Sequence, residues 1–354
     1  MKKQITFILL FVFFTVLVHG QRKINRLPDL EGYVTLKCDL HMHTVFSDGQ
    51  VWPTIRVDEA VRDGLDAIAI TDHLEYTPLQ EFVKNDPDAP WKISEEYAKE
   101  RNIILVHGTE IGRNTMPPGH MNALFIKDAS LCNKDSVWGC YEAAIQQGAF
   151  LMWNHPGWKN QRPDGIPKLY DIHYRLIEKG WLHAIEFFNN VDYYPLVLEM
   201  CKQHNLAVMA SSDMHGLISD KYKKPEYINR PMTFVFAKER SHDALKEALF
   251  AGRTLVWFRD KLAGKEEFAK PFFYRCISVS KPYYENDKKI FIEVTNNSDI
   301  PFTLINGGKF PRTVFLEANT VTRIAVSKNA VFPLVYEAEN ILVGEKEFLK
   351  VELK

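Results

Sequence analysis

The stretch Thr35-Leu36-Lys37-Cys38-Asp39-Leu40-His41-Met42-His43 joins a segment containing the apolar residues Leu36, Cys38 and Leu40 directly to two histidines. Residues Thr35–Leu40 have the length and apolar content of a buried β-strand. Because side chains two positions apart on an extended chain point to the same side, both imidazoles can reach one metal ion. A single His-x-His pair is a weak signal, so its meaning depends on how the other strands end.

Apolar segments alternate with helical ones from about Leu36 to Phe258. Strands are expected at Thr35–Leu40, Asp66–Ile70, Ile103–Val106, Met121–Ile126, Ala149–Trp153, Ala184–Phe188, Leu206–Ala210 and Met232–Phe236. Helices are expected at Thr54–Asp63, Glu95–Arg101, Val137–Gln147, Leu169–Lys179, Tyr194–His204 and Ser241–Ala251. Short strands separated by helices indicate a parallel sheet covered by helices, and about seven such units favour a closed α/β barrel over an open sheet.

Candidate metal ligands gather at the ends of these strands. The histidines and acids in question are His41, His43, Asp48, His73, Glu110, His120, His155, Asp213 and His215. Imidazole and carboxylate groups are the usual protein ligands of Zn, Mn and Fe, and one ion needs only three or four of them. Active sites of barrels lie at the carboxyl ends of the strands. Nine candidates there predict two or three divalent metal ions in one pocket.

The N-terminal residues predict export. Lys2 and Lys3 precede the apolar run Ile5–Val18, and Val18-His19-Gly20 has the form of a cleavage site before Gln21. This is the plan of a secretory signal peptide over residues 1–20. The competing interpretation, a membrane anchor, needs about 20 apolar residues, which is more than this run contains. We therefore expect a periplasmic or secreted protein with no membrane span in the mature chain.

The overall charge does not favour stable binding to nucleic acid. The 354 residues include 44 basic and 45 acidic side chains, and the formal net charge is −1. Such a balance gives no reason to expect bulk attraction to a polyanion. The cysteines match neither a zinc motif nor a dense disulfide framework. We interpret Cys38, Cys132, Cys140, Cys201 and Cys276 as buried thiols, although export would permit a Cys132–Cys140 disulfide.

The sequence changes character after about Lys265. Strands are expected at Phe272–Ser280, Lys289–Asn296, Phe302–Ile305, Thr320–Val326 and Val331–Val335, with polar turns between them. This pattern predicts a small antiparallel β-sandwich. The region contains no histidine, so we assign it no chemistry; covering the barrel, aiding substrate entry and supporting dimerisation are open roles. The predicted domains after the signal peptide are a barrel over residues 21–265 and a sandwich over residues 270–354.

The motifs resemble those of a known family. They are His41-Met42-His43-Thr44, Ser47-Asp48-Gly49, Ile70-Thr71-Asp72-His73, Gly108-Thr109-Glu110-Ile111, Gly119-His120, Asn154-His155-Pro156 and Ser212-Asp213-Met214-His215. In this order, over roughly Leu36 to Trp257, they are similar to the motifs of the polymerase and histidinol phosphatase (PHP) family. The predicted export and the following β-domain are similar to the secreted phosphodiesterase-like branch. The resemblance implies a distorted (β/α)7 TIM-like barrel with a site for two or three metals.

The resemblance also implies how the ligands divide. One metal would take His41, His43, Glu110 and Asp213, and a second would share Glu110 and take His120 and His155. A third would take Asp48, His73 and His215, with Asp48 at a position where many members have histidine. Glu110 as a bridging carboxylate and Asp213 as a group able to transfer protons are the candidate catalytic residues.

The chemistry that follows is hydrolysis of a phosphoester by a metal-activated hydroxide. Signatures of a serine nucleophile or of a Walker-type phosphate loop are absent from the sequence. We expect a phosphodiester or a small organic phosphate as the substrate. The alternatives are a phosphomonoesterase similar to histidinol phosphatase and a noncatalytic metal- or ligand-binding protein. The oligomeric state is left open.

Substrate contacts are predicted from basic residues in the loops at the barrel mouth. Arg113 follows Glu110, and Lys159 and Arg162 follow His155. Their charges can neutralise phosphate oxygens. The competing interpretation is solvated loop charge. Glu186 and Asn189 are expected to line the pocket, whereas His183 precedes its strand and is excluded.

Overall fold

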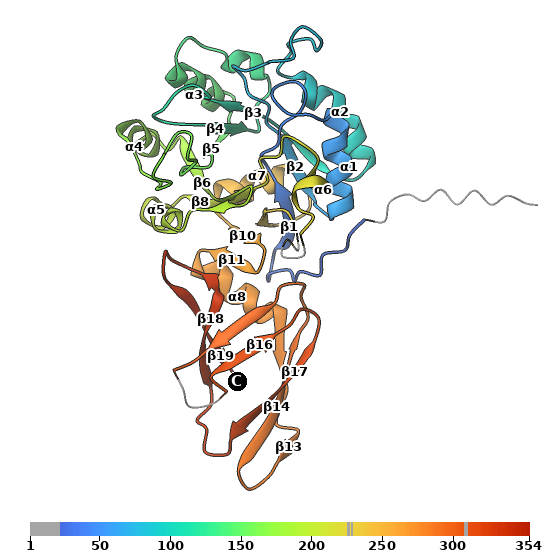
Figure 1. Ribbon diagram of the computed structural model, residues 1–354, viewed down its shortest axis with the longest axis vertical. Helices are drawn as coiled ribbons and strands as arrows, with labels where there is room; N and C mark the ends of the chain where they lie inside the picture. Colours follow the sequence, from blue (N-terminus) through green and yellow to red (C-terminus); the bar gives the residue numbers. More distant parts are fainter. Residues whose placement is uncertain (1–21, 225–226, 228, 308–310) are drawn as a thin grey trace, which may run out of the picture.

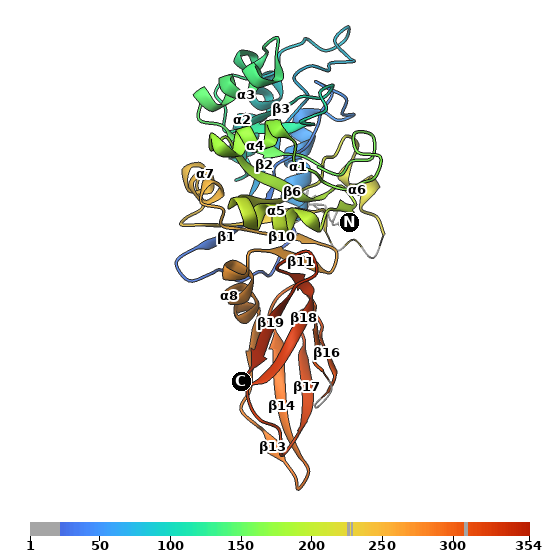
Figure 2. The ribbon, with the colours of Figure 1, turned by 90° about the vertical axis from the view of Figure 1, so that its left-hand side faces the viewer.

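The computed structural model describes residues 22–224, 227, 229–307 and 311–354. An α/β barrel forms one part of the molecule and a smaller, all-β part lies beyond it along the long axis, with helix α8 (Glu266–Cys276) at the junction (Figures 1 and 2). The predicted signal peptide, residues 1–20, lies outside the described residues. No helix among the described residues has the length and apolar character needed to cross a membrane.

The barrel sheet runs in the order β1, β2, β3, β4, β5, β6 and β8. These strands are β1 (Val34–Asp39), β2 (Ala67–Ile70), β3 (Ile104–Ile111), β4 (Met121–Leu124), β5 (Phe150–Trp153), β6 (Leu182–Asn189) and β8 (Ala207–Ser211). Neighbours are parallel except around β4, which is antiparallel to both β3 and β5. The expected parallel sheet is therefore interrupted by one reversed strand.

The barrel closes at one end through main-chain contacts between the extensions of β1 and β8. Met42 forms a parallel bridge with Met214, and the His43 N–H donates to the Met214 carbonyl at 3.0 Å. At the other end, β9 (Met232–Ala237) pairs antiparallel with β1. The Thr233 hydroxyl on β9 links it to β8, since it bonds both the N–H and the carbonyl of Ala210. The predicted closed (β/α)7-type barrel is confirmed in this distorted form.

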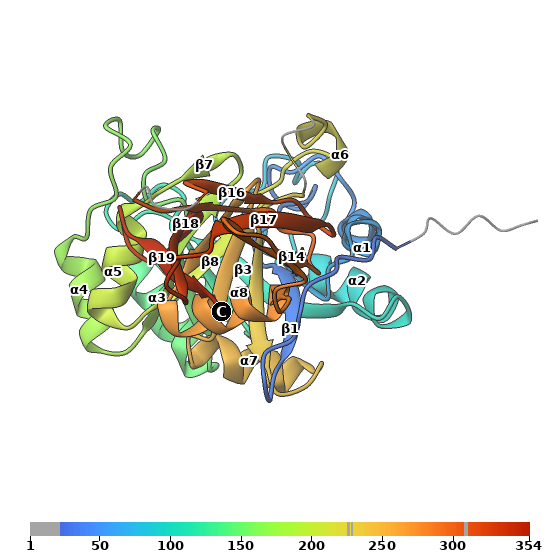
Figure 3. The same cartoon turned by 90° about the horizontal axis from the view of Figure 1, so that it is seen from below.

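Helices surround the barrel (Figure 3). They are α1 (Pro53–Asp63), α2 (Ala89–Glu100), α3 (Val137–Gln146), α4 (Asp171–Glu178), α5 (Leu196–His204), α6 (Ile218–Lys221) and α7 (His242–Phe250), with a 3-10 turn at Ala129–Cys132 and a short strand β7 (Asp192–Tyr193). The expected start of α2 at Glu95 is wrong, because the helix begins at Ala89 with Pro90 in its first turn, and Ser94 is buried inside it. All five cysteines are buried and free.

The C-terminal part consists of two antiparallel sheets, which confirms the predicted sandwich. Its strands are β12 (Ile277–Val279), β13 (Tyr284–Glu285), β14 (Lys289–Asn296), β15 (Phe302–Ile305), β16 (Thr313–Leu316), β17 (Val321–Ser327), β18 (Leu334–Leu342) and β19 (Phe348–Leu353). A hairpin of β10 (Thr254–Phe258) and β11 (Lys261–Gly264) leads out of the barrel, and β11 pairs with β18. One sheet therefore runs through both parts.

The predicted strand over Phe272–Ser280 is wrong for its first half, which belongs to helix α8. Ala269, Phe272, Phe273 and Cys276 are all fully buried, and their spacing is that of one helix face. The Phe272 ring lies 5.6 Å from Phe234 of the barrel, and the Phe273 ring lies 5.0 Å from Phe302 of the sandwich. The helix thus joins the two parts through one apolar core. The predicted start of the C-terminal domain at residue 270 falls inside this helix and stays a prediction.

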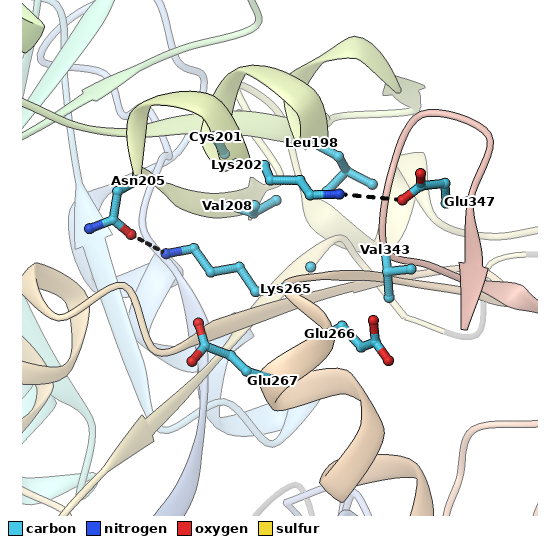
Figure 4. A pocket seen from close by; sticks show the side chains of 11 residues that line it. Leu198, Cys201, Lys202, Asn205, Val208, Lys265, Glu266, Glu267, Val343 and Glu347 are labelled. Carbon is cyan, nitrogen blue, oxygen red and sulfur yellow. Dashed lines mark hydrogen bonds and ion pairs between the residues drawn. The ribbon is translucent and has the colours of Figure 1, made fainter. Parts of the chain in front are cut away.

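A cavity of about 300 Å³ lies at this junction, between α5, the start of α8 and the turn that joins β18 to β19 (Figure 4). Lys202 of α5 forms an ion pair with Glu347 at 3.4 Å, and Lys265 donates to Asn205 at 2.9 Å. None of the nine predicted ligands lines this cavity. This cavity is therefore part of the contact between the two domains and lies apart from the predicted metal ligands.

Candidate metal centre

All nine predicted ligands converge at the end of the barrel where β1 and β8 meet. Their donor atoms form four overlapping groups, each within 4.8 Å. The groups are His41, His43 and Glu110; His41, His155 and Asp213; His73, Glu110 and His120; and His43, Asp48, His73 and His215. The last contains the predicted third set. His120 and His155 lie in different groups rather than together, so the division of ligands among individual ions stays a prediction.

Glu110 is at the centre of the cluster and is fully buried. Its Oε1 atom lies 3.1 Å from His120 Nδ1, 3.3 Å from His41 Nε2 and 3.5 Å from His155 Nε2. Its Oε2 atom lies 3.0 Å from His73 Nδ1 and 3.4 Å from His43 Nε2. One carboxylate therefore faces five imidazoles, which is the arrangement expected of a group that bridges cations.

Several imidazoles are oriented by hydrogen bonds on the side away from the cluster. The His41 Nδ1 atom pairs with Glu186 at 3.0 Å, and the His120 Nε2 atom pairs with the Arg113 carbonyl at 3.1 Å. The His215 Nδ1 atom pairs with the Asp213 carbonyl at 3.0 Å. Each contact places the ring proton on the outer nitrogen and leaves the inner nitrogen free to bind a cation, as partners of metal-ligating histidines usually do.

Other atoms of the cluster lack partners of their own. Glu110 Oε2, Asp48 Oδ1 and His73 Nδ1 are buried and make no hydrogen bond of good geometry among the described residues. Buried polar atoms without partners are rare in folded proteins and call for an explanation. Cations among these donors would satisfy them, so the residues present fit a metal centre.

The charges of the cluster balance one another. Burial would raise the pKa of Asp213 and of Glu110, but the facing imidazoles hold both pKa values well below the usual range. Burial lowers the pKa of His43 to about 3. Burial would also lower that of His215, but Asp48 raises it to about 9. The carboxylates thus stay charged and need positive partners, a need that divalent ions also meet.

The backbone of the site is strained where ligands leave their strands. His155 and Asp213 have positive φ values of 28° and 48°, which residues with a β-carbon seldom adopt. Such conformations persist where the surrounding structure enforces them, and they concentrate at functional sites.

Gly49 has a different constraint, because a Cβ atom there would lie 2.5 Å from the Thr44 nitrogen. Its lack of a side chain lets the loop with Asp48 fold back onto His43.

A buried arginine that the sequence did not reveal fixes the seam between β1 and β8. The Arg56 guanidinium donates to the carbonyls of His43, Met214, His215 and Gly216 at 2.7–3.1 Å. It also forms a 2.7 Å ion pair with Glu59, which accepts from the Ile218 N–H. Arg56 therefore positions the segments that carry ligands without touching the cluster.

The predicted substrate contacts differ in their positions. Arg113 reaches the cluster, with Nη2 3.3 Å from Asp48 Oδ2. Lys159 is exposed. The Arg162 guanidinium is engaged within its own loop, by Asp164 at 2.9 Å and by the Ile166 carbonyl at 3.1 Å. Glu186 lies against His41 as expected, and Trp158, whose ring centroid is 5.3 Å from His155, also lines the site. Substrate binding by Lys159 and Arg162 stays a prediction.

The loop that carries His120 is held by a buried histidine of α4. His173 Nδ1 accepts from the Tyr170 N–H, and its Nε2 atom donates to the Pro118 carbonyl, each at 3.0 Å. Burial lowers the pKa of His173 to about 4, although the Pro118 carbonyl opposes the shift. This ring therefore stays neutral in the folded protein between about pH 6.5 and 4, where the unfolded chain binds a proton.

The expected consequence is a loss of stability as the pH falls through that interval. A shift of this size corresponds to about 3 kcal/mol. In His173→Gln, where the amide can keep the helix-capping contact, the acid loss should be smaller by about that amount. Urea unfolding of the two proteins at pH 7 and at pH 4.5, with chelator present, measures the difference. Equal acid losses would show that His173 does not titrate as described.

Comparisons with known proteins identify the families of both parts. The model of the PHP domain family matches residues 39–248, and that of an Ig-like domain matches residues 277–354. A two-domain protein from Bacteroides vulgatus, described as containing a predicted PHP-like metal-dependent phosphoesterase, is 37% identical. The match covers 94% of this chain and 99% of that protein, with a TM-score of 0.90.

A more distant solved structure, a candidate metal-dependent phosphoesterase from Bifidobacterium adolescentis, is 18% identical with a TM-score of 0.41. That match covers 61% of this chain and 96% of the other. No curated protein matches this chain. The family match spans more than half of the chain and contains every candidate ligand, and the similarity to the Bacteroides protein extends over both parts. The chain belongs to the PHP domain family and carries an Ig-like domain after its barrel.

Proposed function

We propose that this protein is a metal-dependent hydrolase of phosphoesters, acting on phosphodiesters or small organic phosphates. The observation that carries the proposal is the Glu110 carboxylate, which faces five imidazoles in a buried cluster. The description of the Bacteroides relative as a predicted metal-dependent phosphoesterase supports the same reaction class. The mixed imidazole and carboxylate donors suit Zn, Mn or Fe.

Two or three divalent ions in the cluster would lower the pKa of a bound water and offset the charge of a phosphate. The surrounding residues do the rest. Glu110 and Asp213 hold negative charge between the imidazoles, and Asp213, whose side chain is 15% exposed, can also pass a proton to or from the reacting group. Arg113 supplies a guanidinium for nonbridging phosphate oxygens. Trp158 covers one side of the site.

We also propose that the protein is exported, with cleavage before Gln21. The basic, apolar and small-residue segments of residues 1–20 support this. The first described residues are already attached to the folded protein, because the Lys23 N–H donates to the Arg62 carbonyl at 3.1 Å. Mass spectrometry of protein recovered from cell fractions would give the mature N-terminus; intact Met1 in the cytoplasmic fraction would contradict export.

An assay with two chromogenic substrates tests the reaction. Protein with Mn²⁺ or Zn²⁺ should hydrolyse bis(p-nitrophenyl) phosphate faster than p-nitrophenyl phosphate, and a chelator should stop both reactions. Elemental analysis of active protein should find at least two metal equivalents per chain. Preference for the monoester would reassign the enzyme as a phosphomonoesterase. Absence of turnover with every metal would leave a binding protein.

A further inference from the structure

The side chain of Arg113 contacts the carboxylate of Asp48, which also belongs to the predicted third set of metal ligands. We propose that the Arg113 guanidinium and a divalent ion compete for Asp48, so that the set of Asp48, His73 and His215 binds its ion more weakly than the rest of the cluster. While this set holds no ion, Arg113 serves as the cation that binds the phosphate of the substrate. The inference rests on the proposed function and extends it to the control of metal occupancy.

The competition follows from the contacts of Asp48. Its Oδ2 atom lies 3.3 Å from Arg113 Nη2 and 3.6 Å from His73 Nε2. Its Oδ1 atom lies 3.1 Å from His215 Nε2. Both oxygens already face a positively charged or ligating group. An ion bound between Asp48 and His73 would stand beside the guanidinium, and two cations sharing one carboxylate oxygen at this range repel each other.

Arg113 is held in this place from two sides. Its guanidinium carbon lies 3.4 Å from the centroid of the Tyr76 ring, a stacking contact that arginine makes readily. Its carbonyl accepts from His120, which fixes the main chain relative to the cluster. The side chain is 27% exposed, so a phosphate in solution can reach it.

The predicted sets of ligands also differ in the number of carboxylates that they contain. Glu110 and Asp213 both belong to the predicted first set and lie 3.3 Å from His41, which Glu186 contacts on its other side. Asp48 is the only carboxylate in the group that contains the third set. The third set therefore has one carboxylate of its own where the first set has two, and that carboxylate is the one that Arg113 contacts.

The test is a titration of metal-stripped protein with Mn²⁺ in competition with a chromogenic chelator. The wild-type protein should show two tight sites and one weaker site. In Arg113→Gln, the weaker site should bind about tenfold more tightly, since removing one of two competing groups favours the other. The two tight sites should be unchanged.

A matched control is available on the outer surface of the barrel. Arg101 stacks on Tyr97, with its guanidinium carbon 4.3 Å from the ring centroid, and pairs with Asp58 at 3.0 Å. This arginine, tyrosine and aspartate repeat the contacts of Arg113 away from the cluster. Arg101→Gln should therefore leave all three metal affinities unchanged.

A second measurement follows binding of inorganic phosphate. With two metal equivalents, Arg113→Gln should bind phosphate about tenfold more weakly than the wild type. At saturating Mn²⁺ the difference should shrink, because an ion in the third set would then attract the phosphate in both proteins.

The outcomes separate this inference from the proposed function. Fewer than two tight sites in the wild type would contradict the metal-dependent hydrolase itself. With two tight sites present, an unchanged third site in Arg113→Gln, no third site in either protein, or an equal gain in Arg101→Gln would overturn the competition alone. A phosphate defect of equal size at low and saturating Mn²⁺ would also overturn it.

Discussion

Glu110→Gln should lower metal-dependent phosphoester hydrolysis by about 10³-fold or more. The carboxylate faces five imidazoles and is fully buried, so its replacement removes the negative charge at the centre of the cluster. An amide is neutral, and its NH₂ group is a donor. It would donate to the inner nitrogens of the histidines, which would otherwise bind a cation. The variant should also retain fewer metal equivalents, because the negative charge between the cations is gone.

Elemental analysis and thermal unfolding check the cause of the lost activity. Added Mn²⁺ should raise the unfolding temperature of the wild type, since an ion that binds only the folded state stabilises it. This rise should be much smaller in Glu110→Gln. Glu337→Gln, an exposed position on β18, provides the control and should match the wild type in activity and in metal content. Full metal binding by an inactive Glu110→Gln would instead place Glu110 in the chemistry and not in ligation.

The positions of the candidate ligands could be predicted because the sequence displays both the apolar strands and the polar residues at their ends. Apolar strands mark where the sheet lies, and their carboxyl ends mark where side chains converge. His41, His73 and Glu110 were therefore predictable without knowing how the strands pair. The reversed direction of β4 was not predictable in this way, because a four-residue apolar strand looks the same in either orientation.

Other features depend on tertiary contacts that the sequence does not display. Arg56 lies in an amphipathic helix, where a charged residue normally indicates the solvated face, and only the barrel seam reveals its carbonyl partners. Helix α8 was predictable in principle, from the apolar spacing of Ala269, Phe272, Phe273 and Cys276. Its aromatic residues and the strands that follow it favoured the prediction of a strand, which is wrong for the part that belongs to the helix.

Arg56→Met should destabilise the folded protein by about 3–5 kcal/mol, the range for removing one partner of a buried ion pair. The methionine can fill much of the space but leaves the Glu59 charge and several carbonyls without their donor. The loss should appear in urea unfolding with chelator present, so that weaker metal binding does not contribute. Arg62→Met, on the same helix, removes a pair in which the arginine side chain is 45% exposed and should cost about 0–1 kcal/mol.

The two variants together separate a positioning role from simple loss of charge. Because Arg56 bonds the carbonyls of His43 and His215, its removal should loosen the seam that carries ligands from β1 and β8. At a temperature where Arg56→Met is still folded, its metal affinity should fall, whereas Arg62→Met should keep wild-type affinity. Misplaced supports of metal ligands commonly cost about 10–100-fold in affinity. If Arg56→Met were destabilised yet bound metal like the wild type, the arginine would hold the barrel together without setting the geometry of the centre.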